Sequence, residues 1–147
     1  PGPVNLALRA PYTTTHPNIY NFGSTGQLTD GSWAADAQHC FATNEDDKFP
    51  KDQVVDLGQT HEITSLKFGV PPFGSTKTVL VAVSLDGKIF TEAGNHVFGQ
   101  NKAESAVIKL KPTLARYVKL SAPDHHDPVV QYPNTFVFLS ELEVYGK

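Results

Sequence analysis

The residues of this 147-residue chain that are best suited to bind a ligand are aromatic and histidine side chains in segments rich in proline and asparagine. An aromatic ring can pack on an apolar face of a ligand, while polar side chains hydrogen-bond the ligand's polar groups. Both kinds of side chain occur in these segments. The candidate ligand-binding residues are Trp33, His39, Phe41, Asn44, Phe73, Lys77, His125, Tyr132 and Phe136.

Several of these residues also have a purely structural interpretation, which stays open. Trp33, Phe41 and Phe136 are equally well explained as core side chains. Phe73 stands among prolines and glycine, which favours exposure. The pair His125-His126 fits a solvated loop, and adjacent histidines in a strand would point apart, so the pair is a weak zinc signal.

Motifs for catalysis are absent from the sequence. The segment Gly23-Ser24-Thr25-Gly26 has the wrong spacing for a nucleophile elbow, and no glycine-rich phosphate loop occurs. The acidic run Glu45-Asp46-Asp47 is expected to be a solvated surface. Loops could still bring two carboxylates together for catalysis, but nothing in the sequence requires it. We therefore predict a binding domain and not an enzyme.

Composition limits the class of protein. A chain of 147 residues is expected to form one domain that buries roughly 68–70% of its unfolded surface. The net charge of −3 and the lack of a Lys/Arg run make nucleic acid and anionic membranes poor partners. Cys40 is the only cysteine, which rules out an internal disulfide.

The start of the chain carries no recognisable signal peptide, and the chain contains no methionine. The longest aliphatic run, Val79–Val83, is too short to span a membrane. We expect residues 1–147 to be a single module that belongs to a larger protein.

Strand signals dominate over helix periodicity. Val79, Val81, Val83 and Leu85 alternate along an apolar run, Asp86-Gly87 supplies a tight turn, and Lys88–Thr91 is expected to return as the partner strand.

Other segments complete an antiparallel pattern with frequent turns, which is typical of a sandwich or barrel. Pro112 is expected to mark a connection between two of the strands. The further strand candidates are Gln53–Gly58, Glu62–Phe68, Ala106–Leu110, Arg116–Leu120 and Leu139–Tyr145. Four long segments fit no strand and are expected to be loops that carry function: Thr13–Gly31, Ser32–Lys51, Gly69–Thr76 and Pro123–Thr135.

Six phrases in order resemble the discoidin-like domains, also called coagulation-factor type C domains, and among these the family 32 carbohydrate-binding modules of bacterial glycoside hydrolases. The phrases are Asn5–Leu8, Leu28–Gly31, Val54–Gly58, Val83–Gly87, Ala115–Leu120 and Glu141–Gly146. The resemblance implies an all-β, antiparallel β-sandwich jelly roll of about eight strands. Animal members usually join their ends by a disulfide. Because this chain has only Cys40, a bacterial module is favoured.

The resemblance also implies a structural Ca²⁺ ion, which takes six to eight oxygen ligands. Carried over by position, the side chains of Asp30 and Glu141 would bind it. The carbonyl groups that complete the shell are those of Gln27, Ser32, Ala35 and Ser140. Relatives often have Thr or Ser in place of Ala35, so a water would stand in there. In the simpler interpretation Asp30-Gly31 is only a turn and Glu141 is a solvated strand residue.

In galactose-binding relatives the sugar contacts a histidine and an aromatic of the first long loop, an Arg and an Asn of a middle loop, and an aromatic near the last strand. Here His39 with Trp33 or Phe41, and Phe136 or Tyr132, would fill the outer roles. The middle loop, Gly69–Thr76, has neither Arg nor Asn, and Lys77 is the nearest cation. Another sugar, or none, is therefore possible. Further candidate hydroxyl partners are Asn44, Asp124 and Asn134.

The expected function is that of a non-catalytic module that targets an attached glycoside hydrolase, or a similar secreted enzyme, to glycans. The alternative is a protein- or cell-surface-adhesion domain of the same family without sugar binding. A membrane-binding version would need exposed apolar loop tips with basic residues behind them, and only Phe73 and Lys77 are present. A secreted, periplasmic or cell-surface location in a bacterium is expected.

Overall fold

The computed structural model of the chain describes residues 4–19, 26–33, 36, 39–43, 48–128 and 135–147. These residues form eight strands and no helix, and all of the strand pairs are antiparallel, so the predicted all-β class is confirmed. No helix long and apolar enough to cross a membrane occurs in these ranges. The strands are β1 (Tyr12–Thr14), β2 (Phe41–Thr43), β3 (Lys51–Val70), β4 (Thr78–Ser84), β5 (Thr91–Val97), β6 (Glu104–Ala122), β7 (Val137–Leu139) and β8 (Glu141–Gly146).

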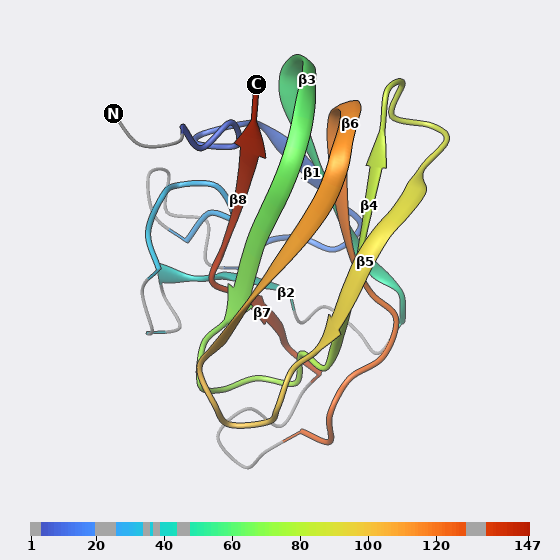
Figure 1. Ribbon diagram of the computed structural model, residues 1–147. Helices are drawn as coiled ribbons and strands as arrows, with labels where there is room; N and C mark the ends of the chain where they lie inside the picture. Colours follow the sequence, from blue (N-terminus) through green and yellow to red (C-terminus); the bar gives the residue numbers. More distant parts are fainter. Residues whose placement is uncertain (1–3, 20–25, 34–35, 37–38, 44–47, 129–134) are drawn as a thin grey trace.

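Two long strands, β3 and β6, build both layers of the sandwich. The main sheet has the order β1-β3-β6-β4-β5, and β8 pairs with β3 further along the same edge as β1. Figure 1 shows β3 and β6 bending at one end, so that their two halves lie in different layers. One layer contains β8 with the later half of β3 and the earlier half of β6. The other contains β1, the remaining halves, β4 and β5.

The irregularities in β3 and β6 lie at Gly58 and Pro112, where strands were predicted from the sequence to end. Gly58 has a φ of 88°, and the β3–β6 register shifts between Asp56 and His61. Pro112 lies at a second irregularity, where Ile63 pairs with Thr113 but Ser65 pairs with Lys109. A proline at a bulge removes no regular ladder bond. The prediction of separate strands on either side of Gly58 and Pro112 is therefore wrong, because each pair is one bent strand.

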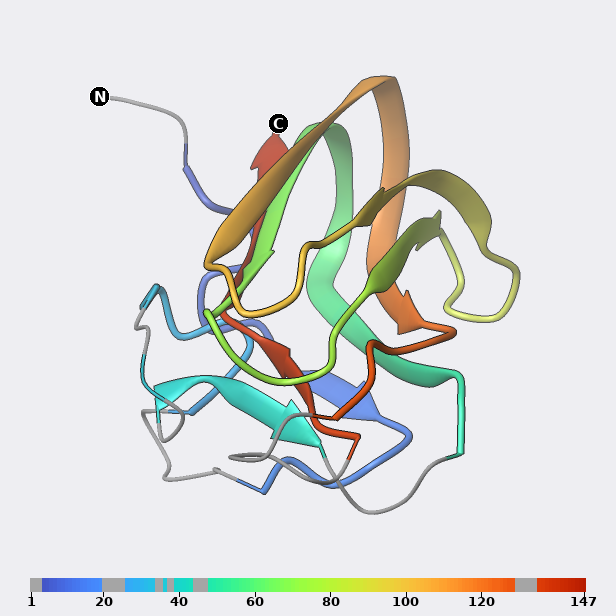
Figure 2. The same ribbon diagram turned by 90° about the horizontal axis from the view of Figure 1, so that it is seen from below.

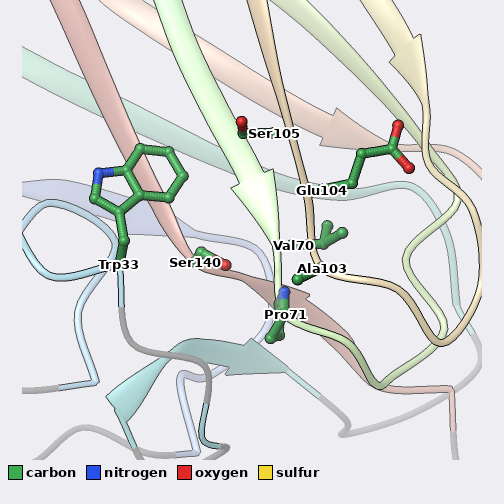
Figure 3. Close-up of a pocket in the computed structure, with 7 residues that line it drawn as sticks. All are labelled: Trp33, Val70, Pro71, Ala103, Glu104, Ser105 and Ser140. Atoms are coloured by element: carbon green, nitrogen blue, oxygen red, sulfur yellow. The ribbon is translucent and has the colours of Figure 1, made fainter.

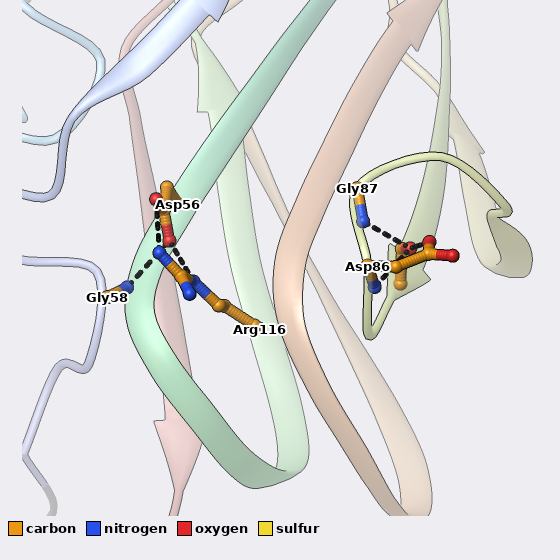
Figure 4. Close-up of polar contacts among 6 residues, drawn as sticks. Asp56, Gly58, Asp86, Gly87 and Arg116 are labelled. Atoms are coloured by element: carbon orange, nitrogen blue, oxygen red, sulfur yellow. Dashed lines mark hydrogen bonds and ion pairs between the residues drawn. The ribbon is translucent and has the colours of Figure 1, made fainter.

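Polar side chains fasten the strand bend and the hairpin turn (Figure 4). The Asp56 carboxylate accepts hydrogen bonds from the Gly58 N–H at 2.8 Å and from Arg116 Nε at 2.8 Å. Hydrogen bonds from Arg116, above all, lower the pKa of Asp56. The segments Val54–Gly58 and Ala115–Leu120, which contain these residues, therefore stabilise the bend of the two long strands.

The predicted hairpin of β4 and β5 is confirmed, but its second strand begins later than expected. Asp86 Oδ1 accepts hydrogen bonds from the Lys88 and Ile89 N–H groups at 2.8 and 3.0 Å. These bonds hold Lys88 and Ile89 in the turn, so β5 starts only at Thr91, which pairs with Val83.

A short strand pair, β2 with β7, was not predicted. β2 lies in the segment Ser32–Lys51 that was expected to be a loop, and β7 begins at Val137, before the predicted strand Leu139–Tyr145. Figure 2, seen from below, shows these strands at the end of the sandwich next to the loop that follows β3. The Thr76 hydroxyl in that loop donates to the Phe138 carbonyl at 2.8 Å and accepts from the Phe138 N–H at 2.9 Å. All three residues of β2 are buried. A three-residue strand is too short to show a sequence period, which explains why it was missed.

Gly74 gives a stability prediction with a matched control. Gly74 has a φ of 91°, and an added Cβ would lie 2.4 Å from Phe138 Cδ2. Gly58 has a similar φ of 88°, but an added Cβ would meet nothing within 4 Å. Gly58→Ala should cost about 1–2 kcal/mol for its backbone conformation, and Gly74→Ala about 1–3 kcal/mol more for overpacking. Urea denaturation measures both, and equal losses would contradict the packing contribution.

Cys40 should be unreactive in the folded protein. Its side chain is fully buried, and burial, followed by the nearby Asp36 carboxylate, raises the pKa of the thiol to about 12. Because the thiolate is the reactive form, an aromatic disulfide reagent at pH 8 should label Cys40 only after denaturation. Stoichiometric labelling of the native protein would contradict this placement.

Candidate functional site

Trp33 lies on the outer face of the main sheet and belongs to neither apolar core cluster. Its Nε1–H donates a 2.7 Å hydrogen bond to Glu143 Oε2 on β8. The Lys67 ammonium lies 4.8 Å from the centroid of the indole ring. A Cβ added to Gly69 would lie 3.0 Å from Trp33 Cζ3, so this glycine leaves the space that the indole occupies. The interpretation of Trp33 as a core residue is therefore wrong.

Strand alternation decides which side chains surround the indole. Successive residues of a strand point to opposite faces, and Phe68 is fully buried in the core. Its neighbours Lys67 and Gly69 therefore point outward. In the register of the sheet, Gly69 lies between Glu141 and Ser105. The outer face next to Trp33 is thus made from β8, β3 and β6.

A groove of about 230 Å³ lies beside the indole (Figure 3). It is smaller than the roughly 300–1,000 Å³ of typical drug-sized ligand sites. Its surface combines the indole and other apolar groups with hydroxyl groups and one carboxylate, a combination that suits a small ligand with an apolar face and a polar rim. The lining residues are Trp33, Val70, Pro71, Ala103, Glu104, Ser105 and Ser140.

Glu104 supplies the carboxylate of the groove and is held firmly. His96 Nε2 lies 2.6 Å from Glu104 Oε2, and the Gly99 N–H donates to Glu104 Oε1 at 3.1 Å. Lys102 Nζ lies 3.9 Å from the same Oε1. The hydrogen bond with His96 is the largest of the interactions that lower the pKa of Glu104. Glu104 is therefore an ionised hydrogen-bond acceptor near neutral pH.

The phenylalanines proposed as ligand contacts lie mostly in the interior. Phe41 in β2 is fully buried and packs edge-on against Tyr12 at a centroid distance of 5.6 Å. Phe136 is also buried and stacks on Phe138 at 5.4 Å. For Phe41 and Phe136 the core interpretation is correct, because buried rings cannot contact a ligand. Phe73 is half-buried and meets Phe138 edge-on at 4.9 Å.

The remaining ligand candidates lie away from the groove lining. The His125 ring packs on Phe49 at 4.9 Å, and the Lys77 carbonyl accepts a 2.8 Å hydrogen bond from the Phe98 N–H. His39 is exposed and pairs through Nδ1 with the Asp36 carboxylate. The structure therefore divides the candidates between the Trp33 groove, the loop end near Phe73, and exposed positions. Asn44 and Tyr132 lie outside the described residues.

The residues proposed to bind a metal lie together where a turn meets the start of β8. Glu141 is fully buried, and its Oε2 accepts a 2.6 Å hydrogen bond from the Gly31 N–H. Asp30 Oδ1 accepts from the Ser32 N–H at 2.9 Å, and Oδ2 accepts from the Gln27 N–H at 3.3 Å. The interpretation of Glu141 as a solvated residue is wrong. Ser140 is adjacent, and Ala35 lies outside the described residues.

Electrostatics in this turn favour a cation. Burial, with a further contribution from the nearby Asp30, raises the pKa of Glu141 to about 9. Among the described residues, no atom donates a hydrogen bond to the buried Glu141 Oε1. A buried carboxylate oxygen without a donor is costly, and a bound cation would relieve that cost. Among the described residues, no three His, Cys, Asp or Glu side chains are close enough together to hold a metal ion. Most ligands of such a cation would therefore be carbonyl groups or water.

A comparison with models of protein families shows the family of this chain. The model of the F5/8 type C domain matches residues 13–134. The chain belongs to the F5/8 type C domain family. This confirms the resemblance to discoidin-like domains that the ordered phrases indicated. A comparison with curated protein sequences found no match.

Solved structures share the fold of this F5/8 type C domain. CpGH89CBM32-5 from Clostridium perfringens, in complex with GalNAc-β-1,3-galactose, is 21% identical, with coverage of 92% of this chain and 94% of that chain and a TM-score of 0.72. Chitosan-binding module 1 from a chitosanase/glucanase of Paenibacillus sp. IK-5 is 20% identical, with coverage of 97% and 99% and a TM-score of 0.71. The lectin domain of lectinolysin, complexed with Lewis b antigen, is 21% identical, with coverage of 98% and 97% and a TM-score of 0.70.

Sequence reasoning missed the residues of this F5/8 type C domain that surround Trp33. They come from three strands that are distant in sequence and form no local motif: Lys67, Gly69, Glu104, Ser105 and Glu143. The alternation in Leu66–Gly69 was a usable signal, because it predicts that Lys67 and Gly69 share one face. Which strands lie beside that face depends on the long-range pairing.

Proposed function

We propose that this domain is a non-catalytic carbohydrate-binding module whose ligand occupies the Trp33 groove. The observation that carries the proposal is a half-buried indole that borders a groove of about 230 Å³ containing Ser105 and Glu104. The indole offers apolar contact to one face of a sugar ring. The hydroxyl and carboxylate groups accept hydrogen bonds from its hydroxyl groups.

Similar folds support a sugar as the ligand. The solved relatives include structures in complex with GalNAc-β-1,3-galactose and with Lewis b antigen, a chitosan-binding module, and a fucose-binding module from Streptococcus pneumoniae. These ligands differ widely, so they favour carbohydrate in general and no particular sugar. A shallow groove buries little of its ligand, and the affinity of a single site should be weak.

The module would act by holding an attached catalytic domain near its glycan. A glycoside hydrolase or a similar secreted enzyme is the partner that the similarity to enzyme-derived modules favours. A location outside the bacterial cytoplasm, where polymeric glycans occur, follows from that role.

A structural Ca²⁺ ion is part of the proposal. The side chains of Asp30 and Glu141 would bind it, and carbonyl groups of Gln27, Ser32 and Ser140 would complete the shell. The fit is supported by the buried Glu141 Oε1, to which no described atom donates a hydrogen bond. The ion would supply positive charge to the buried Glu141 and the half-buried Asp30, and it would join the turn at Asp30-Gly31 to the last strand.

The test is a glycan array followed by calorimetry on each hit. Binding of at least one class of glycan, with a stoichiometry of one, is the expected result. If no glycan binds while a protein partner or cell surface does, the carbohydrate function is wrong.

The alternative, an adhesion domain without sugar binding, has one feature in its favour. The side chains of Leu85, Ile89 and Leu114 are 60%, 77% and 60% exposed. They line a second groove of about 330 Å³ at the hairpin turn and the strand bend. If the alternative is correct, substituting all three by serine should remove adhesion. If the ligand is instead a glycan in the Trp33 groove, the same substitutions should leave its binding intact.

A further inference from the structure

The outer face of the main sheet continues past the Trp33 groove as a regular array of side chains. In the register of the sheet, Lys67 on β3 lies between Glu143 on β8 and Val107 on β6. In the next row, Ser65 lies between Tyr145 and Lys109. We call the surface formed by Lys67, Val107 and Lys109 the lysine face.

Lys67 and Lys109 are diagonal neighbours on this face. Diagonal residues of an antiparallel pair lie about 7–8 Å apart. Lys109 is exposed, and Val107, which lies on β6 opposite Lys67, is 57% exposed. Two ammonium groups are therefore presented together beside an exposed aliphatic side chain, and the Lys67 ammonium also lies 4.8 Å from the centroid of the Trp33 ring.

Neither ammonium group is neutralised by a close carboxylate. Among the residues that the structure describes, no Asp or Glu oxygen lies within 4.0 Å of Lys67 Nζ or Lys109 Nζ. Glu143 stands beside Lys67 in the sheet, but its two oxygens accept hydrogen bonds from Trp33 Nε1 at 2.7 Å and from the Tyr145 hydroxyl at 2.6 Å.

The other carboxylate bordering this surface is also paired. Glu104 contacts His96 and the Gly99 N–H, and Lys102 Nζ lies 3.9 Å away. Both carboxylates that border the lysine face are thus held by other donors, and neither forms an ion pair with Lys67 or Lys109. Two ammonium groups without an ion-pair partner among the described residues, next to a ligand groove, suit an anionic group on the ligand.

We propose that the lysine face binds the anionic group of an acidic glycan, a carboxylate or a sulfate, while a sugar ring of the same chain occupies the Trp33 groove. This assignment rests on the carbohydrate-binding function proposed above and names its ligand class. Lys67 and Lys109 donate charge-assisted hydrogen bonds to the anionic oxygens. Val107 contacts the apolar face of the sugar that carries them.

Matched glycan pairs test the assignment. Free-acid oligogalacturonides are compared with their methyl esters, and sulfated galactans with the same galactans after desulfation, each at low and high salt. The charged member should bind about three- to tenfold more tightly per site, because exposed ion pairs contribute only modestly. High salt should remove the difference. The two pairs distinguish carboxylate from sulfate as the preferred group.

Variants locate the effect on the lysine face. Lys109→Gln should reduce the preference for the charged member and leave binding of the neutral member unchanged. Lys67→Gln should also reduce that preference, and because the Lys67 ammonium packs on the Trp33 ring it is compared with Lys109→Gln at equal affinity for the neutral member. Lys88→Gln is the matched control, because Lys88 is equally charged and lies in the exposed hairpin turn between β4 and β5. Thermal melting of each variant checks that the fold is intact.

The outcomes separate the two proposals. Equal affinity for charged and neutral members, or an acidic preference that survives both lysine substitutions, would overturn the ligand class while carbohydrate binding stands. Failure of every neutral and acidic glycan on the array to bind would instead contradict carbohydrate binding itself.

Discussion

Replacing Trp33 by alanine should weaken glycan binding by at least tenfold. The indole is the largest apolar group in the groove, and burying an aromatic side chain contributes about 1.5–3 kcal/mol, which corresponds to roughly 10- to 150-fold in affinity. Calorimetric titration with a glycan identified on the array measures the loss.

Two further variants and a melting control make the Trp33 result decisive. Trp33→Phe keeps an apolar ring but loses the 2.7 Å hydrogen bond to Glu143, so it should retain part of the affinity. Phe73→Ala removes the half-buried ring at the loop end and should leave binding within about twofold. If Phe73→Ala abolishes binding and Trp33→Ala does not, the ligand site lies at the loop end. Thermal melting separates loss of binding from loss of the fold.

Short apolar strands and turns are local signals, and they were sufficient to predict an antiparallel all-β domain. The jelly-roll sandwich was implied by the resemblance to discoidin-like domains. The phrase Glu141–Gly146 coincides with β8, and the Asp86-Gly87 turn joins β4 and β5. The bends of β3 and β6 were not predictable from local pattern. Gly58 and Pro112 usually end strands, and only pairing between the two long strands keeps them continuous.

The site was only partly predictable, for a physical reason. Trp33 could be selected because a single tryptophan in a loop is conspicuous, but its setting depends on Gly69 and Glu143, from strands distant in sequence. Phe41 looked like a loop aromatic until its pairing with Leu139 placed it in β2. Exposure is a property of the assembled sheets, so aromatic residues in loops cannot be divided into core and ligand contacts by composition.

Calcium should raise the melting temperature of the domain, and removing it with a chelator should lower it. At a free calcium concentration of 100 times Kd, binding to the folded state alone adds about 2.7 kcal/mol. For a domain of this size that corresponds to about 5–10 °C. Glu141→Gln should abolish the shift, and Glu92→Gln, which removes an exposed carboxylate on β5, should keep it. An unchanged melting temperature in chelator would contradict the calcium site.

The pH dependence of stability gives a second, metal-free measure of the same site. Without calcium the pKa of Glu141 is about 9 in the folded state and about 4.3 in an unfolded chain. Between these values the folded state binds a proton that the unfolded state has released, so the free energy of unfolding must fall as pH rises from about 4.3 to about 9. Calcium stabilises the ionised carboxylate in place of the proton.

Urea denaturation in chelator should therefore show stability falling between pH 5 and pH 9, and calcium should flatten the profile. Glu141→Gln should lack the part of this fall that is due to Glu141, and calcium should no longer change its profile, because its amide does not titrate. A profile in chelator that is flat for the parent protein would mean that Glu141 is already ionised and satisfied without a metal. The buried, donor-free Oε1 of Glu141 makes that outcome unexpected, since a buried carboxylate without a cation is strongly disfavoured.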